Sequence, residues 1–205
     1  MNVSEEVHEP VVDNTESADL NCSLTISNEE QDYTTTDDVD SSTIDKENLV
    51  TSMSALKETS LSVEQRVQVL VSAASSPGKF WVQQEQQTSQ LEALLNSMFD
   101  FFSSLADEKL CVQDVEDGTV VAALFAEDES WYRGKVSVSD SGIQVFFLDH
   151  GNTETVTVEN LRLLPEEFSQ LPVQAIPCCL GGVSAEDGEW SDEAVSMFEE
   201  LTAEK

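Results

Sequence analysis

The chain has 205 residues, which is enough for one ordinary domain or for two small ones. Its 41 acidic residues far outnumber its 9 basic residues and give a formal net charge of −32. A field of this sign repels nucleic-acid phosphates and anionic membranes and attracts basic peptides, so direct binding of nucleic acid is disfavoured.

The cysteines give no sign of a metal site or of a disulfide scaffold. Cys22, Cys111, Cys178 and Cys179 lack the paired spacing of zinc ligands, and they are too few for a disulfide-rich fold. The N-terminus has no apolar run of the signal-peptide type, and no segment approaches the roughly 20 apolar residues that span a bilayer. We therefore expect reduced thiols, a cytoplasmic location, no metal, no cofactor and no membrane contact.

Residues 1–60 carry acidic residues throughout, with Lys46 and Lys57 as their only Lys or Arg residues. Their apolar residues are single and aperiodic, so this stretch can bury too little area to offset the entropy of ordering. The composition predicts a disordered acidic tail. The tail can serve as an interaction or phosphorylation segment or as a plain leader, and the sequence leaves both open.

Order is expected to begin near Leu61. Within residues 61–110, apolar runs at 66–72 and 78–83 flank a Ser-Pro-Gly sequence at 76–78. These three residue types form tight turns, so the pattern predicts a β-hairpin.

A helix is predicted after the hairpin. Apolar residues recur at helical spacing between Ser89 and Leu105, and Glu92 stands three residues after Ser89, as in a capping box. We expect a helix from about Ser89 to Leu105 that packs between two lobes of the same chain. The alternative is that its apolar stripe recruits a partner helix.

Short strands with turns at close intervals are predicted next, at residues 120–125, 131–138, 143–148 and 153–158. Strands of this number and length close best as a small barrel, which we place at residues 111–172. A further apolar strand at 175–183 and a helix capped by Ser191 follow.

Three aromatic residues stand near the ends of the barrel strands. Phe125, Tyr132 and Phe147 sit where a small bent sheet could gather them around one ligand-sized hollow. The faces of aromatic rings attract a partly desolvated cation, so the pattern suggests a binder of methylated arginine or lysine. The same pattern also allows Phe125 and Phe147 to lie on the core face of the barrel, as is expected for Trp131.

From Leu61 to Lys205 the chain resembles the extended Tudor domain of germline Tudor proteins. The residues that carry the resemblance, in chain order, are Ser76, Pro77, Phe80, Val82, Gln83, Trp131, Tyr132, Arg133, Asp149, Gly151, Asn152, Leu161, Leu164, Phe168, Leu171, Pro172, Gln174, Ala175, Ile176 and Leu180. The resemblance implies a mainly β (α+β) fold, in which an SH3-like Tudor barrel is inserted in a staphylococcal-nuclease-like, OB-like lobe. The hairpin and the linking helix precede the barrel, and residues 173–205 return into this lobe.

The resemblance also implies a ligand and a site. The ligand is an arginine, usually symmetrically dimethylated, in the Arg-Gly or Arg-Ala tails of PIWI-type proteins. The residues carried over as an aromatic cage are Phe125, Tyr132, Phe147, His150 and Asn152. The Asn152 amide would hydrogen-bond the guanidinium, while Arg133 and Asp149 would form a structural ion pair that orients the cage.

The function implied is a methylarginine reader that recruits PIWI-type proteins to cytoplasmic germ granules. There it would serve the small-RNA (piRNA) pathway that silences transposons during the formation of gametes, including spermatogenesis. The alternative is a scaffold with a degenerate cage, which binds its partners independently of methylation.

One cage position departs from the family, because His150 stands where a tyrosine is usual. Neutral imidazole is a poorer partner for a cation than phenol, and protonated imidazole repels a cation. We therefore expect modest affinity, which falls as the pH drops through the ordinary histidine pKa of about 6.5.

A nuclease-like lobe raises the question of catalysis. Phosphodiester cleavage needs carboxylates that hold a metal and arginines near the scissile phosphate. The lobe carries few basic residues, among them Arg66 and Lys79, and no carboxylate triad on its strands. The two histidines, His8 and His150, lie in the predicted tail and in the cage turn. We expect a protein that is not an enzyme.

The family's lobe continues with further strands and a helix beyond the point that corresponds to Lys205. A lobe without them would leave apolar surface and open sheet edges. We therefore expect a fragment of a longer protein with several Tudor domains rather than a truncated isoform.

Overall fold

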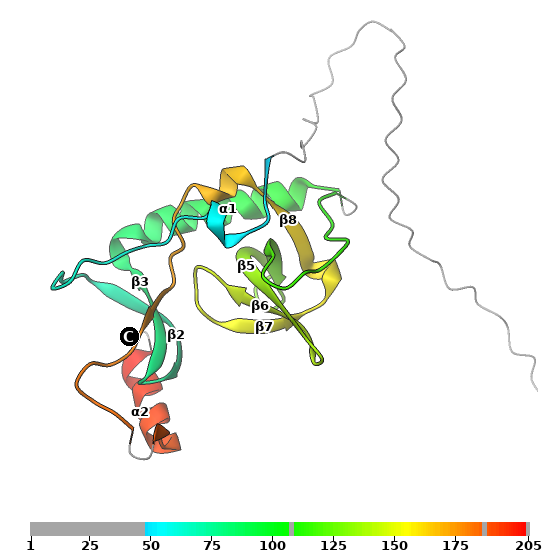
Figure 1. Ribbon diagram of the computed structural model, residues 1–205. Helices are drawn as coiled ribbons and strands as arrows, with labels where there is room; N and C mark the ends of the chain where they lie inside the picture. Colours follow the sequence, from blue (N-terminus) through cyan, green and yellow to red (C-terminus); the bar gives the residue numbers. More distant parts are fainter. Residues whose placement is uncertain (1–47, 107–108, 186–187, 204–205) are drawn as a thin grey trace, which may run out of the picture. The chain divides into compact units, whose positions relative to one another are not determined.

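The computed structural model describes residues 48–106, 109–185 and 188–203 (Figure 1). Residues 1–47, which hold most of the predicted acidic tail, lie outside the described residues. The described chain is mainly β with two α-helices, as the sequence predicts. Within the described ranges, no helix has both the length and the apolar character needed to cross a bilayer.

Six antiparallel strands form one curled sheet. In spatial order they are β1 (Leu49–Val50), β8 (Leu161–Pro165), β4 (Val120–Phe125), β5 (Ser130–Ser139), β6 (Gly142–Phe147) and β7 (Thr153–Val156). The strands β4 to β7 agree with the predicted strands to within two residues at each end. Strands β1 and β8 were not predicted, because one is only two residues long and the other ends in a proline.

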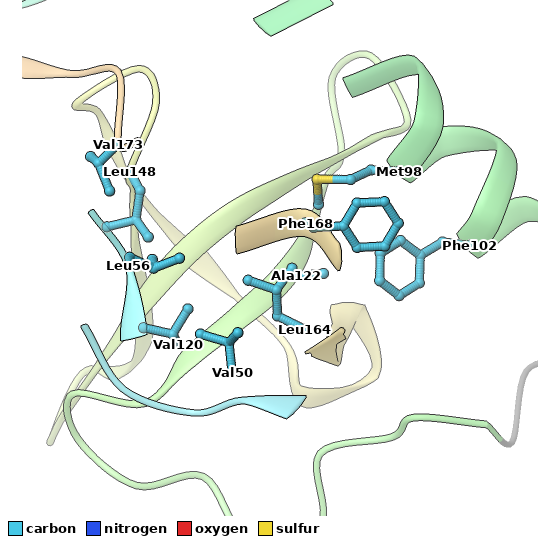
Figure 2. Close-up of a cluster of buried hydrophobic side chains, with 10 residues drawn as sticks. All are labelled: Val50, Leu56, Met98, Phe102, Val120, Ala122, Leu148, Leu164, Phe168 and Val173. Carbon is cyan, nitrogen blue, oxygen red and sulfur yellow. The ribbon is translucent and has the colours of Figure 1, made fainter. Parts of the chain in front are cut away.

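Strand β4 is buried on both faces. Val121 and Ala123 pack in a cluster with Val136, Val145 and other residues of the sheet. Val120 and Ala122 pack on the opposite face, in the cluster that Figure 2 shows. Because successive residues of a strand point to opposite faces, a strand between two cores needs apolar residues at every position. This explains why β4 reads as a continuous apolar run.

The N-terminal boundary of the ordered structure lies earlier than the predicted residue 60. Val50 pairs with Leu164 in β8 and is 2 % exposed, and Leu56 is buried in the same cluster (Figure 2). The Val173 amide donates to the Lys57 carbonyl over 2.8 Å. Residues 49–57 are thus part of the barrel. Their apolar side chains are too few to show a period, and strand β1 pairs with a strand more than 100 residues away.

Three strands form a second antiparallel sheet in the order β2 (Val69–Ser76), β3 (Lys79–Gln84) and β9 (Ile176–Cys178). The predicted hairpin is confirmed, with its turn at Pro77 and Gly78. The predicted last strand at 175–183 is too long, because the chain leaves the sheet after Cys178. We call this sheet together with helix α2 (Asp192–Thr202) the hairpin lobe.

Helix α2 begins as predicted, since the Ser191 hydroxyl accepts a hydrogen bond from the Ala194 amide over 3.3 Å. The helix packs on the hairpin and places the Phe198 ring 5.1 Å from the Phe80 ring. Phe80, Val82 and Phe198 are the buried residues of this small core. The stability of the hairpin lobe therefore depends on few buried side chains.

Helix α1 (Thr88–Ser104) links the hairpin to the barrel (Figure 1). Its N-cap is Gln87 and not Ser89, so the predicted capping box is wrong. A 3-10 turn, η3 (Glu85–Gln87), leads straight into the helix. Other short 3-10 turns among the described residues include η2 (Met53–Ala55), η4 (Val158–Asn160) and η5 (Glu166–Ser169). The apolar stripe of α1 packs on the barrel, with the Phe102 ring 4.8 Å from the Trp131 ring, which is the barrel side of the predicted packing between two lobes.

Candidate functional site

The sheet brings the three predicted aromatic residues together at one end of the barrel. Phe125 ends β4, Tyr132 lies near the start of β5, and Phe147 ends β6. Their ring centroids form a triangle with sides of 5.6, 5.7 and 6.1 Å. A cation near the centre of this triangle would lie well within the roughly 6 Å range of a cation–π contact.

The rings meet nearly at right angles. Interplanar angles are 82° for Phe125 and Tyr132, 85° for Phe125 and Phe147, and 75° for Tyr132 and Phe147. The His150 ring stands 4.9 Å from Tyr132 at 86°. We call these four residues the ring cluster. Such T-shaped contacts set the edge of one ring against the face of the next, so the rings stand as inclined walls rather than as a parallel stack.

The ring cluster also closes the end of the barrel core. Phe147 is only 2 % exposed and belongs to the buried cluster under β4, while Phe125 and Tyr132 pack against that cluster and stay half-buried. Phe147 therefore lies deepest in the ring cluster, and Phe125 and Tyr132 lie nearer the surface. A cage role for these rings stays a prediction.

A carboxylate that the site prediction missed stands beside the ring cluster. The Tyr132 hydroxyl donates to Asp128 Oδ2 over 2.6 Å, and Asp128 Oδ1 accepts from the Ser130 amide over 3.0 Å. Burial, and then the bond and charge of Asp128, raise the pKa of Tyr132 to about 12. The phenol thus stays protonated, and a negative charge next to the rings favours a cation. The acidic turn between the first two barrel strands was the signal for this residue.

Burial favours the neutral form of His150. Burial lowers the pKa of His150 from its ordinary 6.5, and the charges of Asp149 and Asp128 oppose this shift only in part. Neutral imidazole offers a ring face without repelling a cation. Near neutral pH, His150 can therefore line the cluster as a ring wall.

Asn152 lies at the same turn and is half-exposed. Its main-chain carbonyl accepts from the Phe147 amide over 2.9 Å, which ties the end of the turn to the end of β6. This contact involves the backbone of Asn152. The hydrogen bond expected from its side-chain amide to a guanidinium stays a prediction.

Arg133 and Asp149 meet as expected, and both side chains are buried at 0 % and 1 % exposure. The guanidinium donates to both carboxylate oxygens, from Nε over 2.9 Å and from Nη2 over 2.6 Å. Its other donors go to main-chain carbonyls, from Nη1 to Phe168 and Leu171 and from Nη2 to Pro172. Every N–H of the guanidinium is therefore satisfied, which a buried charge requires.

The ion pair fixes the start of the turn that carries the cage residues. Asp149 Oδ1 also accepts from the Gln174 amide over 3.1 Å. The pair thereby ties β5, the turn after β6 and the segment after η5 to one another. His150 follows Asp149 directly, so the position of its ring depends on this anchor.

The hairpin lobe holds the same turn from the other side. The Ser72 hydroxyl donates to the His150 carbonyl over 2.8 Å, and Gln83 Nε2 donates to the Asp149 carbonyl over 2.6 Å. Gly151 has a φ of +90°, and a Cβ atom there would lie 2.3 Å from the Trp81 ring. The turn therefore needs glycine both for its conformation and for its close approach to the hairpin. Apart from Gln83 and Gly151, which the family resemblance marked, these contacts were not predicted.

Among the described residues, no group of three or more His, Cys, Asp or Glu side chains could hold a metal ion. The ring cluster and the Asp128 carboxylate beside it offer aromatic rings, one negative charge and an imidazole whose neutral form burial favours. Such a set can hold an organic cation by cation–π and charge attraction.

Comparison with known proteins agrees with this geometry. The sequence profile of the Tudor domain matches residues 61–182. The chain is 35 % identical over 137 residues to Tudor domain-containing 6 of Danio rerio, covering 66 % of this chain and 6 % of that protein. It is 37 % identical over 158 residues to the Tudor and KH domain-containing protein homolog of Bombyx mori, covering 66 % of this chain and 25 % of that protein. The chain thus spans a quarter or less of these relatives.

Solved structures show the same fold. The extended Tudor domain of human TDRD1, in complex with a symmetrically dimethylated peptide, has a TM-score of 0.68 at 28 % identity, covering 80 % of this chain and 78 % of that one. A variant extended Tudor domain of Drosophila melanogaster Papi, in complex with a methylated Piwi N-terminal peptide, has a TM-score of 0.59 at 31 % identity, covering 66 % of this chain and 69 % of that one. The fold, the profile match and these likenesses show that the chain belongs to the Tudor domain family.

Proposed function

We propose that this chain binds peptides that carry a methylated arginine, and that the ring cluster receives the methylated guanidinium. The observation that carries the proposal is the set of perpendicular rings with Asp128 at its edge. Methylation makes the guanidinium less hydrated and more apolar while it keeps its charge. Ring faces and one nearby carboxylate suit such a group.

The two neighbouring structures support this class of ligand, because one holds a symmetrically dimethylated peptide and the other a methylated Piwi peptide. We further propose that the partners are PIWI-type proteins with Arg-Gly or Arg-Ala tails. In this proposal the chain recruits them in cytoplasmic germ granules for small-RNA silencing in gametogenesis. It acts there by binding and without catalysis, and it contacts neither nucleic acid nor membrane directly.

A calorimetric titration of the full chain tests the binding proposal. The peptide is one Arg-Gly sequence in unmodified and symmetrically dimethylated forms, and the variant is Phe125→Leu. Leucine keeps the apolar volume but removes a ring face, so we expect about tenfold weaker binding of the methylated form, or ~1.4 kcal/mol. Phe101→Leu is the matched control, because Phe101 is also a half-buried ring but packs against the other core cluster, from helix α1.

Two outcomes would contradict the proposal. Equal binding of the methylated and unmodified peptides, unaffected by Phe125→Leu, would favour a scaffold that binds partners independently of methylation. Equal losses in Phe125→Leu and Phe101→Leu would show a general effect on the barrel rather than a role of the ring cluster.

A further inference from the structure

A hollow of about 390 Å³ lies beside the ring cluster, between helix α1 and the start of β5. The residues that line it are Glu92, Leu95, Asn96, Phe99, Ser130 and Tyr132. Tyr132 belongs both to the ring cluster and to this hollow. The hollow and the ring cluster therefore share one side chain.

The lining of the hollow suits a long basic side chain. Leu95 and Phe99 supply apolar surface, and Phe99 is 46 % exposed even though it is a large aromatic residue. Glu92 lies two helical turns before Phe99, on the same side of α1, and supplies a carboxylate. An aliphatic stem can lie across Leu95 and Phe99 while its cationic end meets Glu92.

The charges around the hollow agree with this chemistry. None of the lining residues is basic, and Asp128 accepts a hydrogen bond from Tyr132 at its edge. A carboxylate-bearing guest would meet only like charges here. A neutral apolar guest would leave the Glu92 carboxylate without a counter-charge.

We propose that this hollow is a second ligand subsite, which takes an arginine or lysine side chain of the same peptide whose methylated arginine enters the ring cluster. This inference rests on the proposed function and adds to it. It makes the chain a reader of two basic residues at a set spacing, one methylated and one unmodified.

The shared Tyr132 limits that spacing. Two side chains on either side of one ring come from backbone positions a few residues apart. An extended peptide advances at most about 3.5 Å per residue, so a separation of two to four residues spans roughly 7–14 Å. The second basic residue is expected within this distance of the methylated arginine.

Titration of the full chain with matched peptides tests the inference. All peptides carry one symmetrically dimethylated arginine in a neutral sequence. One series adds an unmodified arginine two, three or four residues away on either side, and the other series has citrulline there, which keeps the shape but removes the charge. Measurement near physiological ionic strength, where the screening length is about 8 Å, suppresses long-range attraction to this acidic chain.

We expect one arginine position to bind three- to tenfold more tightly than its citrulline counterpart. In Glu92→Gln this ratio should fall close to one, and in Phe99→Ala it should shrink. Asp100→Asn is the matched control, because Asp100 is an exposed acidic residue of the same helix that does not line the hollow. It should keep the ratio.

The outcomes separate this inference from the proposed function. If the peptides bind through Phe125 but arginine and citrulline bind equally at every position, the second subsite is overturned and the proposed function stands. An equal loss in Glu92→Gln and Asp100→Asn also overturns it, because the attraction would then be diffuse. If no methylated peptide binds, both proposals fall.

Discussion

The barrel and the hairpin lobe support the site in different ways. The barrel has two cores, and strand β4 between them has four successive residues, 120–123, that are fully buried. The hairpin lobe has a core of three buried residues and leaves Met197 of α2 63 % exposed. The lobe's contribution to the site is instead a set of direct contacts to the turn at residues 149–152.

The barrel therefore supplies most of the folding stability, whereas the hairpin lobe positions the turn that carries His150. Buried apolar area is the main favourable term in folding, so the barrel is expected to hold most of the stability of the described chain. The hairpin lobe adds little area but fixes the backbone on either side of the His150 ring. Local unfolding of the lobe would therefore loosen the ring cluster while leaving the barrel folded.

The largest expected effect comes from the buried ion pair of the barrel. Asp149→Ala leaves the Arg133 guanidinium buried without its counter-charge, so we expect a loss of about 4 kcal/mol in the free energy of unfolding. Urea denaturation followed by fluorescence measures it. Asp140→Ala removes an exposed carboxylate from the same barrel and should change stability by less than about 0.5 kcal/mol. Similar losses in both variants would show that the pair does not anchor the barrel.

The second prediction concerns the core of the hairpin lobe. Phe198→Ala removes one of its three buried side chains, and a cost of about 3 kcal/mol is expected. Hydrogen exchange should then show lower protection in β2 and β3 and unchanged protection in β4 to β6. Met197→Ala is the control, since this neighbouring side chain is exposed. Equal loss of protection in both sheets would mean that lobe and barrel unfold as one unit.

The third prediction breaks the contacts between lobe and turn without touching either core. The double variant Ser72→Ala and Gln83→Leu removes the donors to the carbonyls of His150 and Asp149. We expect methylated-peptide affinity to fall about fivefold, or ~1 kcal/mol, because the turn is no longer held in one position. Amide chemical shifts of Gly151 should move as well.

Ser137→Ala serves as the control for that variant, because it removes an exposed hydroxyl from β5. Unchanged affinity in the double variant would show that the barrel alone sets the geometry of the ring cluster. A loss of affinity that tracks only the loss of thermal stability would assign the contacts a purely structural role.

The last prediction concerns the pH dependence that His150 brings. Since burial lowers its pKa, the unfolded chain binds the proton first as the pH falls below about 6.5. The His150 contribution to stability is therefore present above that pH. It is lost as the pH falls from 6.5 to the lower folded pKa, below which the loss stops growing.

Peptide affinity should follow the folded pKa of His150, so it is expected to fall at lower pH than the sequence alone suggested. His150→Tyr should strengthen binding by about 0.5–2 kcal/mol, the range of one cation–π contact, and should remove this pH dependence. Titrations at several values between pH 5 and pH 8 measure both effects. Parallel pH profiles for the two proteins would remove His150 from any binding role.

Local pattern predicted much of the fold, and particular residues show why. Strand β4 was predictable because it is an unbroken apolar run, and the hairpin because Pro77 and Gly78 leave the chain few options. Strand β1 and the buried Leu56 were not, since two or three apolar residues carry no period. The start of α1 was misplaced, because a 3-10 turn leads into the helix and replaces the cap that Ser89 suggested.

Some residues of the candidate site could also be named from the sequence, whereas the contacts between them could not. The sequence alone, through strand ends and the family resemblance, named the aromatic residues, His150, Asn152 and the pair of Arg133 and Asp149. The sequence could not show which residues that are far apart in the chain lie close together in space. The Ser72 hydroxyl meets a carbonyl 78 positions away, and the hollow under Phe99 exists only because α1 lies across β5.

The sequence by itself determined the class of this protein, because hydrophobic period, turn residues and strand-end aromatics are local features that each segment carries in its own composition. The tertiary structure decided the rest: which rings meet, which charge stands beside them, and how the hairpin lobe holds the turn. The physical reason is that these contacts join segments far apart in the chain. Their geometry is fixed by packing and by the need to satisfy buried polar groups, which no local pattern records.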